Sequence, residues 1–84
     1  MKFYSTMLEE QETHIWVDYF GRKLVIYTSR QPVYNRLMKK LGEPKKTDAI
    51  KGEIASGTWE IDIEDKKVIS SVLNRTILVG KYSK

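Results

Sequence analysis

The side chains of this chain best suited to binding chemistry are basic and lie in the middle of the sequence. Residues 20–52 hold nine Lys or Arg against two acids, Glu43 and Asp48, in a chain of 84 residues with a net charge of +4. Such cations suit nucleic-acid phosphates and acidic protein surfaces, and they are also common on the solvated face of a helix. The candidate binding cations are Arg30, Arg36, Lys39, Lys40, Lys45 and Lys46.

Aromatic residues form a second candidate group. Trp16, Phe20 and Tyr27 lie in stretches rich in β-branched and aromatic residues, so we expect some of them on the outer face of a sheet. Outward rings stack on bases in proteins that bind single strands, and Trp and Tyr are also enriched at hot spots of protein interfaces. Trp16 and Tyr27 therefore join the candidate binding residues, and the sequence leaves the kind of partner open.

Residue types needed for catalysis are sparse. His14 is the only histidine and the chain has no cysteine. A histidine without an evident nucleophile or acid partner is a poor candidate for a general base, and none of the serines stands in a nucleophile-elbow pattern. We therefore expect a non-catalytic protein in which His14 lies on the surface of a strand or serves in packing.

The acids Glu60, Asp62, Glu64 and Asp65 form one cluster in the sequence. Hard cations need several carboxylate oxygens, but this spacing does not match a calcium loop, and no glycine-rich phosphate loop is present. We expect these acids to face solvent, with Asp62 or Glu64 either capping the helix that follows or complementing the charge at its start. The sequence predicts neither a metal nor a cofactor.

A helix within residues 29–44 is expected to carry the central cations. Pro32 suits its first turn, and Gly42 and Pro44 suit its end. Apolar residues recur every four positions from Val33, which gives one face that can pack on a sheet. The opposite face, which we expect to be exposed, carries Asn35, Arg36, Lys39 and Lys40.

Two antiparallel strands are predicted before this helix, over residues 14–20 and 23–28. Gly21 lies between them, where a hairpin needs a positive φ. After a linker over residues 43–48, residues 50–63 predict a third strand. Its apolar positions change parity, so we place a bulge or bend at Ser56-Gly57, with a tight hairpin there as the alternative.

The last third of the chain favours a second helix. Val68, Ile69, Val72 and Leu73 follow helical spacing within residues 64–74, although a strand there is not excluded, and residues 77–80 form an optional last strand. The predicted order is β-β-α-β-α, a small antiparallel sheet with helices on one face, which is an α+β fold. Residues 1–84 make one domain, with 1–12 and 81–84 loosely ordered.

The sequence shows no signal peptide and no apolar run long enough for a membrane span. We expect a soluble, cytoplasmic protein that does not bind membranes. An exposed sheet edge can pair two copies, so the expected state is a monomer or a homodimer.

Short segments carry a resemblance to known proteins. They are Glu12-Thr13-His14-Ile15, Tyr27-Thr28-Ser29-Arg30, Lys40-Leu41, and Gly52-Glu53-Ile54 followed by Trp59. In these segments the chain resembles a loose group of small accessory proteins of phages and integrative elements of Gram-positive bacteria. The resemblance implies a context in which such proteins often bind a host protein and inhibit it. Some of them are anti-CRISPR proteins, which block an RNA-guided nuclease. It implies no residue roles, and the basic charge departs from acidic proteins that mimic duplex DNA.

The leading hypothesis from the sequence is a non-catalytic interaction protein that binds a host protein or nucleoprotein and inhibits a bacterial defence system. The alternative is weakly specific DNA or RNA binding through the basic central helix. The two differ in salt response, because phosphate contacts weaken steeply with added salt whereas aromatic hot spots do not.

Overall fold

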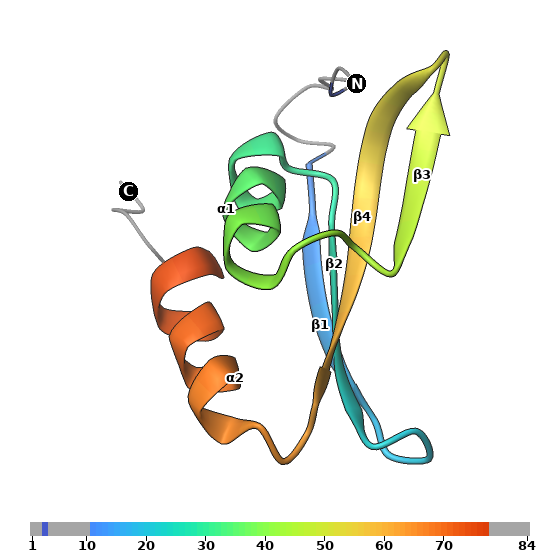
Figure 1. The fold of residues 1–84 in the computed structure, drawn as a ribbon. Helices are drawn as coiled ribbons and strands as arrows, with labels where there is room; N and C mark the ends of the chain where they lie inside the picture. Colours follow the sequence, from blue (N-terminus) through green and yellow to red (C-terminus); the bar gives the residue numbers. More distant parts are fainter. Residues whose placement is uncertain (1–2, 4–10, 78–84) are drawn as a thin grey trace.

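The computed structural model describes residue 3 and residues 11–77 and shows one antiparallel sheet with two helices on one of its faces (Figure 1). The strand order in the sheet is β1-β2-β4-β3. The α+β class predicted from the sequence is confirmed, with one strand more before the second helix than expected. The elements are β1 (Thr13–Asp18), β2 (Lys23–Thr28), α1 (Gln31–Leu41), β3 (Lys46–Ile50), β4 (Glu53–Asp62), α2 (Lys66–Val72) and the π-helical segment η2 (Leu73–Ile77).

The predicted first hairpin is confirmed, with β1 and β2 paired from Thr13 opposite Thr28 to Asp18 opposite Lys23. The expectation for its turn is wrong, because the positive φ of 57° falls on Arg22 and not on Gly21. The Gly21 N–H instead donates a hydrogen bond of 3.0 Å to Asp18 Oδ1. The Asp18 side chain therefore helps to close the turn.

Helix α1 begins and ends where the sequence predicts. Pro32 lies in its first turn. Gly42, with a φ of 87°, donates its backbone N–H to the Met38 carbonyl at 2.9 Å. A positive φ of this kind strains any residue with a side chain, so glycine suits this position. The buried face of α1 consists of Val33, Tyr34 and Leu37.

The segment predicted as a single third strand belongs in fact to a second hairpin, β3–β4. Its turn is Lys51-Gly52, where both residues have positive φ, 52° and 78°. This is the pattern of a two-residue hairpin turn whose twist matches that of the strands. Residues 46–48, which were predicted to belong to a linker, form the first three residues of β3. The predicted hairpin at Gly57 does not occur.

The predicted bulge exists but lies just before Ser56. Asp48 is paired with Ser56 and Ala49 with Ile54, so Ala55 is left without an opposite residue. The extra residue moves Ile54 onto the face that bears Trp59, because side chains alternate along a strand. The sequence therefore predicted the bulge correctly, but placed it at Ser56-Gly57, whereas it lies at Ala55.

Helix α1 is a crossover connection. Strands β2 and β3 are both antiparallel to β4, so they run in the same direction, and α1 joins them across β4. Gly57 lets the helix approach the sheet closely, because a Cβ there would lie 2.7 Å from Tyr34 Cε2. The core between helices and sheet contains Leu24, Ile26, Val33, Tyr34, Leu37, Trp59, Ile61, Val72 and Ile77.

The second helix is confirmed and runs past its predicted end, since α2 continues into η2 as far as Ile77. Neither Asp62 nor Glu64 caps this helix, because Asp65 occupies the cap position, and the Asp65 side chain makes no capping bond. Asp62 Oδ1 accepts the Glu64 N–H at 3.0 Å in the turn before the helix. In the optional last strand, residues 78–80 lie outside the described residues, as do 1–2, 4–10 and 81–84 of the predicted loose ends. In the described part of the chain, no helix has the length and apolar character needed to span a bilayer.

Candidate binding surfaces

The cations of α1 lie on the side of the helix that faces α2 and η2. Lys39 and Lys40 are exposed. Arg36 is half-buried, and its Nε donates a hydrogen bond of 2.9 Å to the Thr76 carbonyl. The expectation that Arg36 is simply an exposed cation is therefore wrong, because the side chain also ties α1 to η2.

The second helix adds cations that the sequence reasoning left out, namely Lys66, Lys67 and Arg75. A hollow of about 380 Å³ between α1 and η2, which we call the inner hollow, is lined by Arg36, Lys39, Lys40, Ser71, Arg75 and Thr76. A second hollow of about 500 Å³, which we call the outer hollow, is lined by Lys66, Lys67, Ser70, Ser71, Asn74 and Arg75. Because the two hollows share Ser71 and Arg75, they form one continuous surface. We call the six cations of the two hollows the basic helix layer.

No acid accompanies these cations on their own elements. The segments Gln31–Leu41 and Lys66–Ile77 contain the six cations and no Asp or Glu. The described acids lie in the strands and in the loops and turns, including Asp65 at the start of α2. Like charges gathered without acids raise a positive potential over the surface. The fold therefore separates charge between the helices and the rest of the described chain.

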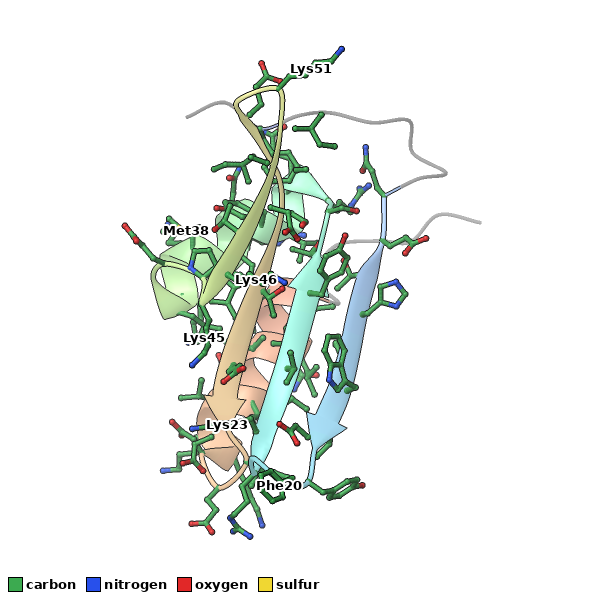
Figure 2. The ribbon with its side chains drawn as sticks, turned by 90° about the vertical axis from the view of Figure 1, so that its right-hand side faces the viewer. Phe20, Lys23, Met38, Lys45, Lys46 and Lys51 are labelled. Atoms are coloured by element: carbon green, nitrogen blue, oxygen red, sulfur yellow. The ribbon has the colours of Figure 1, made fainter. Side chains whose placement is uncertain are left out.

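The remaining predicted cations lie elsewhere. Arg30 precedes α1, and its Nη1 donates to Gln11 Oε1 at 2.9 Å. Lys45 Nζ lies 3.8 Å from Glu60 Oε1. Lys46 is exposed on the edge strand β3, and Lys45 and Lys46 appear together in the view of the sheet (Figure 2). The structure thus divides the predicted basic set, and only the α1 cations join a larger group.

The outer face of the sheet carries the predicted aromatic residues of the strands. Trp16 is 49% exposed and lies opposite Val25, which is buried although it faces away from the helices. Tyr27 is half-buried, and its ring centroid is 5.9 Å from that of His14. Tyr27 is the diagonal neighbour of Trp16 across the two strands, and side chains of this length can touch over such a diagonal. The face is therefore apolar around Val25 and open to a partner at Trp16.

The tip of the first hairpin continues this apolar character. Tyr19 is 83% exposed and Phe20 is fully exposed at 101%. Phe20 stands at one end of the sheet, and the Lys51 turn stands at the other (Figure 2). We call Trp16, Tyr19, Phe20 and Tyr27 the aromatic surface. The sequence predicted three members of this surface, Trp16, Phe20 and Tyr27, and did not indicate Tyr19.

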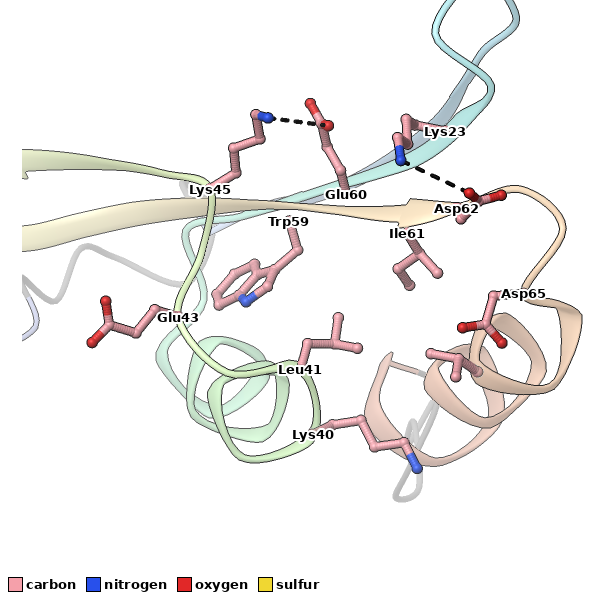
Figure 3. A pocket seen from close by; sticks show the side chains of 11 residues that line it. Lys23, Lys40, Leu41, Glu43, Lys45, Trp59, Glu60, Ile61, Asp62 and Asp65 are labelled. Atoms are coloured by element: carbon pink, nitrogen blue, oxygen red, sulfur yellow. Dashed lines mark ion pairs between the residues drawn. The ribbon is translucent and has the colours of Figure 1, made fainter.

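A third hollow, of about 690 Å³, lies between β4 and the facing ends of the two helices (Figure 3). Trp59 and Ile61 point from β4 toward the helices, and Leu41 points back from α1 (Figure 3). Trp59 Nε1 donates to the Gly42 carbonyl at 2.9 Å, which fixes the indole. This hollow has an apolar floor and a charged rim, and its lining contains no Ser, Thr, His or Cys that could act as a nucleophile or a base beside one.

Three of the four clustered acids, Glu60, Asp62 and Glu64, are paired with bases. Asp62 Oδ2 lies 4.0 Å from Lys23 Nζ, and Glu64 forms an ion pair with Arg22. His14 Nε2 lies 2.6 Å from Glu12 Oε1, and both side chains are exposed. Within residues 11–77 and residue 3, no group of three or more His, Asp or Glu is placed to hold a metal ion.

Comparison of the chain with protein-family models, with curated proteins and with solved structures found no match.

Proposed function

We propose that this chain is a cytoplasmic, non-catalytic interaction protein that binds a partner protein through the aromatic surface. The observation that carries the proposal is the exposure of Tyr19 and Phe20 at the hairpin tip, next to half-exposed Trp16. Scattered apolar side chains are ordinary on protein surfaces, but three large rings on one strand and its turn are the type of residue that anchors an interface.

The energetic reason is the hydrophobic effect. Burying a Phe side chain that was fully exposed stabilises a complex by about 1.5–3 kcal/mol. Phe20 contributes almost nothing to the fold in the free chain, because its ring is not covered. Its turn is nevertheless held, since Asp18 Oδ1 accepts the Gly21 N–H and Arg22 forms an ion pair with Glu64. A ring presented on a turn held in this way loses little conformational freedom on binding.

The resemblance to accessory proteins of phages and mobile elements suggests the kind of partner. In that setting the partner is a host protein or nucleoprotein, and the consequence of binding is inhibition of a bacterial defence system, as with anti-CRISPR proteins. The aromatic surface supports binding to a protein. The identity of the target and its inhibition belong to the proposal and rest on the resemblance.

The test is capture of partners by the tagged protein and two variants from a lysate of a Gram-positive bacterium, run with and without nuclease treatment. Phe20→Ser removes the most exposed ring, and Ile50→Ser removes an apolar side chain of similar type, 41% exposed, on β3. We expect a protein that is retained by the natural sequence and by Ile50→Ser and is lost with Phe20→Ser. Equal retention by all three, or recovery of nucleic acid alone, contradicts the proposal.

A further inference from the structure

We propose that the basic helix layer is a second binding site, independent of the aromatic surface, and that it takes the sugar–phosphate backbone of a double-stranded nucleic acid. The site consists of Arg36, Lys39 and Lys40 from α1 and Lys66, Lys67 and Arg75 from α2 and η2. Docking of η2 against α1 assembles the site, because α1 alone supplies only half of its cations.

Charge complementarity identifies the occupant as a polyanion. The two helical segments hold no acid, so no side chain of these elements neutralises the layer. An acid three or four residues away on a helix would offset such a cation, and neither helical segment supplies one. A duplex supplies the matching charge, at about one phosphate for each 1.7 Å of its axis.

The basic helix layer is long enough to contact several successive phosphates of a nucleic-acid strand. Lys66 and Arg75 are nine residues apart in a continuous helical segment, which at a rise of 1.5 Å per residue spans about 14 Å. One strand of a duplex places about four phosphates along that length. Serines add hydroxyl donors between the cations, with Ser70 and Ser71 in the outer hollow and Ser71 also in the inner one. Hydroxyls and cations together are the usual contacts to phosphate oxygens.

Arg36 and Arg75 make the inner hollow the best-defined phosphate position. The hydrogen bond to Thr76 uses Arg36 Nε and fixes the side chain beside the hollow. The guanidinium retains the N–H groups of its two Nη atoms, which are the donors that hold phosphate oxygens. Arg75 lies in the π-helical segment, a rare wide turn that often occurs at functional sites.

The absence of aromatic side chains from the layer favours a duplex over a single strand or a protein. The linings of both hollows contain no Phe, Tyr or Trp. Proteins that bind single strands stack bases on such rings, and protein interfaces are anchored by them. Contact with the backbone of a duplex needs neither, so we expect binding without sequence preference.

The expected salt dependence follows from the number of cations. Each neutralised phosphate of a duplex contributes about −0.9 to the slope of log K against log salt concentration. Contacts from five or six cations therefore predict a slope of about −4.5 to −5.4. By the same relation, each such contact strengthens binding about eightfold when the salt concentration falls tenfold, from 1 M to 0.1 M.

The experiment is fluorescence anisotropy with a labelled DNA duplex of arbitrary sequence, a matched RNA duplex and the single strand, at several salt concentrations. Lys39→Glu/Lys67→Glu reverses one charge on each helix. Lys46→Glu/Lys51→Glu is the matched control, because it changes net charge equally at exposed residues of β3 and its turn. Lys40→Gln/Arg75→Gln removes two charges without reversing them. It replaces the first variant in the binding measurement if that variant does not fold.

We expect the duplexes to bind more tightly than the single strand. Lys39→Glu/Lys67→Glu should weaken duplex binding about 60-fold at 0.1 M salt and reduce the slope by about 2, whereas the control changes affinity much less. Equal loss in the control, a slope near zero, or tighter binding of the single strand overturns the proposal. Competition by polyglutamate as effective as by duplex also overturns it, in favour of an acidic protein. Phe20→Ser should leave duplex affinity unchanged, so the proposals for the aromatic surface and for the basic helix layer can be refuted independently.

Discussion

Replacing Gly57 with alanine should loosen the attachment of α1 to the sheet. The new Cβ would lie 2.7 Å from Tyr34 Cε2 and 3.0 Å from two carbons of the Trp59 ring. Carbon atoms in proteins pack best at about 3.5–4.0 Å. Neither ring yields easily, because both are buried and Trp59 is also held by its hydrogen bond to the Gly42 carbonyl. The substitution therefore forces a shift of helix or strand.

The expected cost is the difference between two effects. Overpacking of a well-packed core costs about 1–3 kcal/mol, and the reduced freedom of the unfolded chain returns about 0.4–1 kcal/mol. A net loss of about 1–2 kcal/mol lowers Tm by about 5–15 °C for a chain of this size. Circular dichroism during heating measures it.

The contact with Tyr34 provides the internal control. In a Tyr34→Leu background the nearest ring atom is gone, so Gly57→Ala should cost at least 0.5 kcal/mol less than in the natural sequence, as expected for residues in contact. A Tm that rises with Gly57→Ala, or an equal cost in both backgrounds, would refute the reasoning about close helix packing.

Three further predictions concern the turns and the helix contact. Gly52→Ala should lower stability by about 1–2 kcal/mol, because Gly52 has a φ of 78° and nothing nearby compensates for the strain; urea denaturation measures it, and an unchanged midpoint contradicts it. Arg36→Met should cost about 1 kcal/mol through the lost bond to Thr76, and faster hydrogen exchange in η2 than in β2 would show where the loss acts. Phe20→Ser should leave Tm within about 2 °C, because the ring is fully exposed; a larger fall would mean that the ring supports the fold.

Helix α1 could be predicted closely because its signals are local. Pro32 and Gly42 mark its ends by their own backbone preferences, and its apolar face repeats at helical spacing. Strand β3 was missed because all of its residues are exposed, so it shows no alternation of buried and exposed positions. Its turn, Lys51-Gly52, lacks the Asn or Asp that usually marks such a hairpin.

The candidate surfaces were predictable only in part, because they depend on tertiary contacts. The bond from Arg36 to Thr76 joins residues 40 apart in sequence, and no local pattern reveals it. Lys67 and Arg75 repeat on the exposed side of a helix whose apolar stripe was recognised, so their shared face could have been inferred. The position of Arg75 beside Lys39 and Lys40 follows only from the docking of η2 against α1.

The most direct measurement of the central claim is photo-crosslinking from position 20. Phe20 is replaced by a photoreactive phenylalanine analogue, with Ile50 replaced in the same way as the control, and both proteins are irradiated in nuclease-treated Gram-positive lysate. Binding through the aromatic surface predicts a discrete protein adduct from position 20 and a much weaker one from position 50. No adduct from position 20, or equal adducts from both positions, would contradict the claim that this surface binds a partner protein.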